Sequence, residues 1–106
     1  MTKAEMIEVL KSVKVPVNEA ISKSDTEFPR IIYWDSIWED VMASGADYAT
    51  NRTYTIWFFS DRPVHPKLIE LKKALNGTGL HPIIYHERTE SGVFQSYFSL
   101  EVIEDV

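Results

Sequence analysis

The sequence predicts an α+β fold in which a mainly antiparallel sheet of four to five strands has two helices packed on one face. Two observations lead to this prediction. Segments with strand character cluster together and do not alternate strictly with helices. Two segments carry apolar residues at helical spacing, one at the N-terminus and one after Pro66. We expect a single domain over residues 1–106, because a chain of this length has too few residues for a second core.

The first helix is expected directly after Thr2, which can cap it. Glu5 follows three residues later, as in a capping box. Apolar residues recur behind the cap at helical spacing: Met6, Ile7, Leu10 and Val13. The helix is expected to end before Pro16. Residues 15–20 then predict a short edge strand, where a proline is tolerated.

Two central strands are predicted on either side of a long loop. Residues 30–34 are rich in β-branched and aromatic side chains, and this strand is expected to extend to Trp38 with a bend. Residues 40–51 show neither strand nor helix periodicity and predict the loop. Residues 52–60 predict the second strand, with Tyr54, Ile56 and Phe58 on one face and Thr53, Thr55, Trp57 and Phe59 on the other. Both faces of this strand therefore carry large apolar groups.

The second half predicts a helix followed by a β-hairpin. Pro66 suits the first helical turn, and Gly77 and Gly79 are expected to end the helix. Its apolar stripe is Leu68, Ile69, Leu71 and Leu75. Residues 82–87 and 93–103 flank the turn-like segment 89–92 and predict the hairpin. On the last strand, one face is expected to point to the core: Phe94, Phe98, Leu100 and Val102.

Composition disfavours several functional classes. The chain has no cysteine, so it has no disulfide, thiol nucleophile or zinc–thiolate site. Its 16 acidic and 11 basic residues give a net charge of -5, which disfavours tight binding to nucleic acid. No segment approaches the roughly 20 apolar residues needed to cross a bilayer. We expect neither a membrane span nor a signal peptide.

No constellation typical of catalysis or metal binding stands out. His81 and His86 have opposite parity on their predicted strand and would point to opposite faces, so they could not share a metal. An acidic cluster, Asp35, Glu39 and Asp40, could serve acid–base chemistry, but carboxylates beside a loop are usually solvated. The chain lacks a nucleophile-elbow motif. We therefore expect no enzyme, with no catalytic residue, metal or cofactor.

The aromatic residues carry more information. Phe58, Phe94 and Phe98 are expected in the core. Two short helices can cover about one sheet face, whereas the strand at 52–60 is apolar on both. The second face is covered either by the loop 40–51 or by a neighbouring subunit. We favour the subunit, because aromatic patches ringed by polar residues are typical of interface cores. The candidate interface residues are Trp38, Tyr48, Trp57 and Phe59, with Tyr48 as the anchor of the loop.

The order of these motifs resembles a known family. The features are the capped N-terminal helix, Phe28-Pro29 before the strand 30–34, the loop 45–49, the strand 53–60, the helix 67–75 and the closing segments 85–87 and 97–102. Together they resemble the tail-completion or tail-terminator proteins of long-tailed bacteriophages and prophages. The resemblance spans nearly the whole chain, although no single motif is specific to the family.

The resemblance implies a structural protein of the virion without catalysis. Such proteins form a ring, typically sixfold, that caps the head-proximal end of the tail tube and joins it to the connector of the head. The implied partners are other copies of the chain in a ring-forming homo-oligomer, the tail-tube protein and the head–tail connector proteins. DNA would be only passing cargo, and no membrane is involved. The implied location is the head–tail junction of the virion, and the bacterial host cytoplasm during assembly.

Two alternatives remain open. Another component of the head–tail connector, an adaptor or a stopper, would share size and partners. A small oligomeric ligand-binding domain unrelated to phages is the other alternative, and an enclosed pocket lined by Trp34, Tyr54 and Trp57 would indicate it. For the first interpretation, we expect Tyr48→Ala or Trp57→Asp to weaken self-assembly or tail joining while leaving the isolated fold largely intact.

Overall fold

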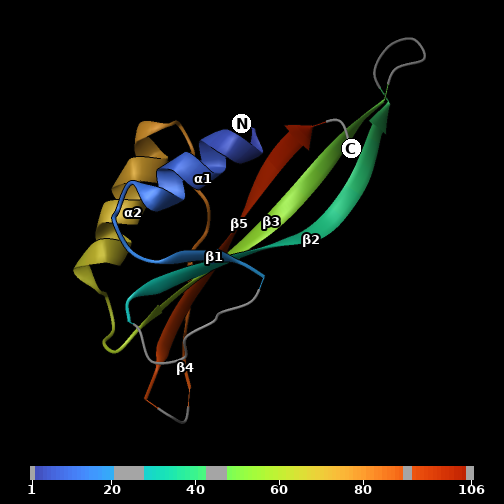
Figure 1. The fold of residues 1–106 in the computed structure, drawn as a ribbon. Helices are drawn as coiled ribbons and strands as arrows, with labels where there is room; N and C mark the ends of the chain where they lie inside the picture. Colours follow the sequence, from blue (N-terminus) through green and yellow to red (C-terminus); the bar gives the residue numbers. More distant parts are fainter. Residues whose placement is uncertain (1, 21–27, 43–47, 90–91, 105–106) are drawn as a thin grey trace.

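A five-stranded mixed sheet and two helices form an α+β fold (Figure 1). The computed structural model describes residues 2–20, 28–42, 48–89 and 92–104, and of residues 40–42, 48–49 and 103–104 it describes the backbone only. The elements in chain order are α1 (Lys3–Lys11), β1 (Val17–Glu19), β2 (Arg30–Met42), β3 (Tyr48–Ser60), α2 (Pro66–Gly77), β4 (Tyr85–Arg88) and β5 (Phe94–Glu104).

The strand order in the sheet is β1-β2-β3-β5-β4. Three pairings are antiparallel, β2 with β3, β3 with β5 and β4 with β5. β1 instead runs parallel to β2, with Val17 opposite Ile31, so the sheet is mixed. Three residues form too short a pattern to predict the direction of a strand. The direction of β1 is set by its pairing with the edge of β2. The prediction of an edge strand within residues 15–20 is confirmed.

Both helices begin where the sequence predicts. Thr2 Oγ1 accepts the Glu5 N–H at 3.2 Å, and Glu5 Oε1 accepts the Thr2 N–H at 3.2 Å, which completes the capping box of α1. At α2, His65 caps the helix by accepting the Lys67 N–H on Nδ1 at 3.0 Å, and Pro66 occupies the first turn. The predicted stripe of α2 is wrong at Ile69, which is 42% exposed because it lies on the flank of the helix away from the sheet core.

Both helices pack on one face of the sheet (Figure 1). β3 alternates as predicted, with every second side chain buried against the helices. One hydrophobic cluster joins both helices to β2, β3 and β5; its fully buried members are Met6, Leu10, Ile31, Tyr54, Ile56, Leu71, Leu75 and Val102. Phe58 and Phe98 are buried, as predicted, whereas Phe94 is half-buried because it lies at the start of β5.

The predicted loop over residues 40–51 is wrong. β2 and β3 pair continuously from Arg30 opposite Phe59 to Met42 opposite Tyr48, so that only residues 43–47 lie outside the described strands. Tyr48 is the first residue of β3, not the centre of a loop, and its side chain lies outside the described part. Residues 40–51 show no strand periodicity in the sequence, and backbone pairing between β2 and β3 holds residues 40–42 and 48–51 in the sheet.

The bend predicted within β2 is confirmed as a β-bulge. The register between β2 and β3 shifts between Asp35 and Ile37. Ser36 Oγ donates to the Thr53 carbonyl at 2.9 Å and accepts from Thr55 Oγ1 at 3.1 Å, which ties the extra residue to β3. Beyond the bulge the alternation restarts, so Ile37 pairs with Thr53 and Trp38 pairs with Arg52.

β4 is shorter than the predicted strand at 82–87. It begins at Tyr85, and Ile84 packs against the hydrophobic core, not in the sheet ladder. Pro82 has no N–H to donate to a ladder, which agrees with this later start. The parity argument for His81 and His86 therefore fails, since His81 lies outside the strand.

The molecule is elongated, with extents of 51 × 26 × 21 Å. Its length comes from the paired ends of β2 and β3, residues 37–42 and 48–53, which we name the arm. In Figure 1 the arm runs away from the helices toward the upper right, while β4 lies at the opposite end of the sheet. The end of β5 flanks the arm, with Glu101 opposite Thr53 and Glu104 opposite Thr50.

Candidate interaction surface

The face of the sheet opposite the helices carries apolar and aromatic side chains. We name this surface the open face; its residues are Ile32, Trp34, Ile37, Trp57, Phe59, Tyr85 and Tyr97. A row crosses four strands in register, from Ile32 through Trp57 and Tyr97 to Tyr85. Trp34, Ile37 and Tyr85 are each about half exposed, at 49%, 56% and 53%. Among the described residues, both helices lie on the other face (Figure 1).

Tyr85 and Tyr97 form a fixed aromatic pair at the β4 end of the open face. Their rings stack with centroids 5.3 Å apart and planes 19° apart. Tyr97 donates its hydroxyl proton to Glu87 Oε1 at 3.2 Å, and Gln95 Nε2 donates to Glu87 Oε2 at 2.7 Å. Burial, and then the bond to Glu87, raises the pKa of Tyr97 above its usual value of 10.0. The hydrogen bond to Glu87 and the stacking on Tyr85 together hold the Tyr97 ring in place.

Arg30 fixes the position of Phe59 at the far edge of the open face. The guanidinium carbon lies 5.1 Å from the centroid of Phe59 and 5.4 Å from that of Phe28. Arg30 itself is only 8% exposed. Its charge is thus placed between two rings, and Phe59 is half-buried at this edge.

A polar cluster lies at the base of the arm, on the side of the sheet that carries the helices. Asp35 Oδ2 accepts from Arg52 Nη2 at 2.6 Å, from Arg52 Nε at 3.1 Å and from Trp38 Nε1 at 2.5 Å. The Arg52 guanidinium lies 5.4 Å from the ring centroids of both Trp38 and Tyr54. The expectation that Asp35 is simply solvated is wrong, since its side chain is 19% exposed and that of Arg52 is 16% exposed.

The four residues predicted for the interface do not form one patch. Trp57 and Phe59 lie on the open face, whereas Trp38 lies on the helix side of the arm and is 59% exposed. The backbone of Tyr48 pairs with Met42 in the arm. Five open-face residues were missed by the sequence prediction: Ile32, Trp34, Ile37, Tyr85 and Tyr97. Parity along 30–34 could have identified Trp34, but Ile37 reaches this face only because of the bulge.

The ligand pocket that would have indicated a small-molecule-binding domain does not form. Trp34 and Trp57 lie on the open face, while Tyr54 points to the helices and is fully buried. The sheet therefore separates Tyr54 from the two tryptophans, and the three side chains cannot line a common cavity.

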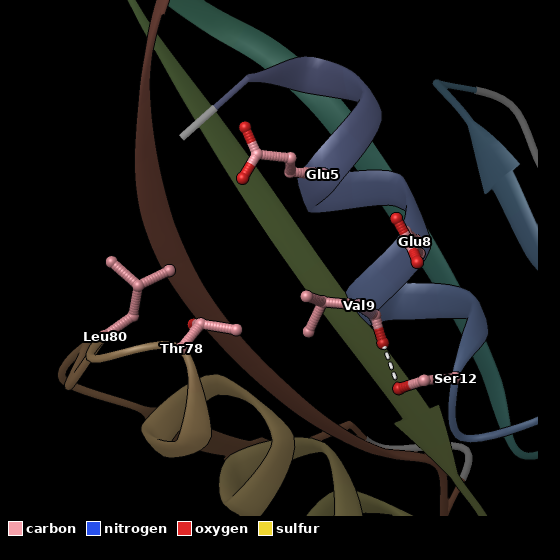
Figure 2. A pocket seen from close by; sticks show the side chains of 6 residues that line it. All are labelled: Glu5, Glu8, Val9, Ser12, Thr78 and Leu80. Carbon is pink, nitrogen blue, oxygen red and sulfur yellow. Dashed lines mark hydrogen bonds between the residues drawn. The ribbon is translucent and has the colours of Figure 1, made fainter.

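A surface hollow of about 480 Å³ lies between α1 and the turn after α2 (Figure 2). Its polar side chains have local structural tasks. Glu5 completes the capping box, and Ser12 Oγ donates to the Val9 carbonyl at 2.6 Å, drawn as the dashed line in Figure 2. Glu8 and Thr78 complete the polar rim, and Val9 and Leu80 form its apolar part. The hollow offers carboxylates and hydroxyls in an open setting that is not organised around a reacting group.

Within the described ranges, no group of three or more His, Asp or Glu side chains is placed to hold a metal ion. His86 instead shares a 2.7 Å hydrogen bond between Nδ1 and Ser96 Oγ. No helix in the described part of the chain is both long and apolar enough to cross a membrane.

Comparison with known proteins leaves the family of this chain undetermined. No model of a known protein family matches the sequence, and a search of curated proteins finds no match. Function is therefore inferred from the open face and the arm.

Proposed function

We propose that the protein is a structural subunit of a phage tail, a tail-completion or tail-terminator protein. In this role, copies of the chain form a ring at the head-proximal end of the tail tube and join the tube to the head connector. The observation that carries the proposal is the aromatic open face. The order of sequence motifs resembles that family. For this reason we assign the open face to a contact within a phage tail.

The open face has the composition of a protein contact. Monomeric proteins rarely expose a contiguous apolar patch that spans a whole sheet, and aromatic residues are enriched at interface cores. The Tyr85–Tyr97 pair is held by its stacking, and the strand register sets where Trp34 and Trp57 lie on the sheet. Burying the stacked pair costs little side-chain entropy, so it suits a central contact with a partner.

The fold also has two different surfaces for contact, as a ring requires. Subunits in a ring associate head to tail, and each must present two distinct, complementary surfaces. The open face lies along the sheet, and the arm extends beyond the helices (Figure 1). The net charge of -5 agrees with a lumen through which DNA passes without being bound.

The test is a substitution in the centre of the open face. Trp34→Asp introduces a charge at a side chain that is already 49% exposed, so the fold should tolerate it. We expect this variant to lose about tenfold or more in binding to purified tail tubes. The matched control is Ile83→Asp, since Ile83 is 71% exposed, also apolar and outside the open face. Binding is measured by co-sedimentation with tubes.

Three outcomes would contradict parts of this proposal. Wild-type binding to connector complexes but not to tail tubes would indicate an adaptor or stopper. Binding to neither would contradict a role in the head–tail junction. Equal binding of Trp34→Asp and Ile83→Asp would show that the open face is not the contact surface.

A further inference from the structure

Charged side chains are segregated between the two sides of the sheet. Three exposed carboxylates lie on the side of the open face, and we name them the acidic rim: Glu39, Glu87 and Glu101. The described strands place one basic side chain on this side, Arg30, which is only 8% exposed. Their other basic residues, Arg52 and Arg88, have the opposite parity and lie on the side of the helices. The described strands therefore give the open face an acidic rim and no exposed cation.

Two carboxylates of the acidic rim are available for a contact. Glu87 is already engaged, because it accepts hydrogen bonds from Gln95 and Tyr97. Glu39 and Glu101 form no ion pair with any residue in the described ranges. A partner that covers the open face and reaches the arm would therefore meet these two charges.

Strand register sets where the two carboxylates lie relative to the aromatic row. Glu39 is opposite Asn51 and Glu101 is opposite Thr53, so the two residues flank β3 on either side. Two strand spacings separate them, which is about 10 Å. Thr53 and Trp57 are four residues apart in β3, so the carboxylates lie about 13 Å along the strand from the centre of the aromatic row. The open face is thus apolar at its centre and acidic at one end.

This charge pattern disfavours contact between the open faces of two copies. In every relative orientation of the two sheets, the carboxylates of one copy meet no exposed cation from the described strands of the other. Placing like charges against each other across an interface is costly. Such a contact would also be isologous and would join two copies only, whereas a ring needs two different surfaces. The partner of the open face must therefore differ from the open face itself.

We propose that the open face docks on a different protein, on a surface that is apolar at its centre and carries Lys or Arg side chains opposite Glu39 and Glu101. The two carboxylates prevent pairing with the open face of a second copy and set the orientation of the partner. Exposed ion pairs add little to affinity, so the aromatic row supplies most of it and the carboxylates mainly set the rate of association. The inference rests on the proposed function only in taking the tail tube as this partner.

The first experiment uses the protein alone. The double variant Glu39→Gln, Glu101→Gln removes both charges and is expected to raise the self-association constant about tenfold in sedimentation velocity, because the apolar faces then pair without repulsion. Adding Trp34→Asp should abolish this gain. The matched control is Glu8→Gln, Glu70→Gln, which removes two exposed carboxylates from the helices and changes the net charge equally. The control should associate no more strongly than the wild type.

Three results of this experiment would overturn the proposal. The first is an equal rise in the two double variants, or no rise in either. The second is wild-type protein that already associates as strongly as the open-face variant. The third is self-association that is weaker in the open-face variant than in the wild type, since a second copy and not a different protein would then supply the cations.

The second experiment measures the binding rates on immobilised tail tubes. The double variant Glu39→Lys, Glu101→Lys reverses both charges, and its association rate constant should fall about tenfold at low salt. The difference from the wild type should shrink as salt is raised, because screening weakens the repulsion. The matched control, Glu8→Lys, Glu70→Lys, should associate as fast as the wild type. An association rate that is the same in both double variants would overturn the basic surface on the partner.

Failure here is distinguishable from failure of the proposed function. If wild-type protein ignores tail tubes, the role in the tail is wrong, and the self-association of the Gln variant still decides whether the carboxylates keep two open faces apart. If Trp34→Asp abolishes binding to tail tubes while the Lys variant binds as fast as the wild type, the role in the tail stands and the basic partner surface is wrong.

Discussion

A single carboxylate, Asp35, organises the base of the arm. It lies at the bulge in β2 and accepts hydrogen bonds from Arg52 and from the indole of Trp38. The bulge turns Asp35 and Trp38 toward the same side, where Arg52 of β3 lies between Trp38 and Tyr54. A partly buried charge pair of this kind fixes orientation as well as adding stability.

Replacing Asp35 with Asn should therefore cost more than a surface substitution. We expect Asp35→Asn to lower the free energy of unfolding by about 1–2 kcal/mol, because it removes the charge from a hydrogen bond that Arg52 makes in a shielded site. Glu39→Gln, an exposed carboxylate on the same strand, should change it by less than about 0.5 kcal/mol. Urea denaturation followed by tryptophan fluorescence measures both. Equal effects would show that the Asp35 cluster contributes no more than surface charge.

At the scale of single elements, the start of α2 depends on a histidine. His65 caps the helix through Nδ1, which must be unprotonated to accept the Lys67 N–H, and its ring lies 5.9 Å from that of Phe58. Burial, and then the positive charge of Arg62, lowers the pKa of His65 below its usual 6.5. In the unfolded chain the ring binds a proton more readily than in the folded protein. Stability is therefore lost as the pH falls below 6.5 toward the pKa of the folded state.

This linkage predicts a pH-dependent cap. The wild type should lose stability between about pH 7.5 and about pH 5. His65→Asn keeps a good N-cap residue that does not titrate in this range, so its loss over the same interval should be smaller. Urea denaturation at both pH values gives the two differences, and NMR titration of the His65 ring reports its pKa directly. Identical pH dependence in the two proteins would contradict the argument.

The elements that the sequence alone predicts best are those with local signals. The capping box of α1, Pro66 at the start of α2 and the alternation along β3 each depend on residues within a few positions of one another, and all three predictions are confirmed. The pairing of β2 with β3 gives no such local signal in residues 40–51, because the backbone of each strand end is held by the other strand and not by its own sequence neighbours. The parallel direction of β1 likewise depends on its partner β2, so the residues of β1 do not reveal it.

The candidate surface was predictable only in part. Trp57 and Phe59 follow from the two apolar faces of β3, and the structure places them on the uncovered one. Trp38 falls on the other side because the bulge at Ser36 reverses the alternation after Asp35, and periodicity cannot locate a bulge to the residue.

For the whole molecule, the long axis and the open face together define where a partner can bind. The protein is 51 Å long, and the arm forms one end of it, away from the helices (Figure 1). Glu39 and Glu101 lie on the same side of the sheet as Ile37, because Glu39 follows Ile37 by two residues in β2 and Glu101 pairs with Thr53, the partner of Ile37. The aromatic row of the open face is therefore continued toward the arm by two exposed carboxylates.

The open-face contact should consequently respond to salt as an apolar interface does. Screening shortens the Debye length from about 10 Å at 0.1 M to about 3 Å at 1 M, so a contact held by charge weakens as salt is raised. Association through the open face buries apolar area and should be maintained or strengthened at high salt. Co-sedimentation with tail tubes across a salt series, on wild type and Trp34→Asp, measures the dependence. Wild-type binding that falls steeply with salt would show that charge, not apolar burial, draws the open face to its partner.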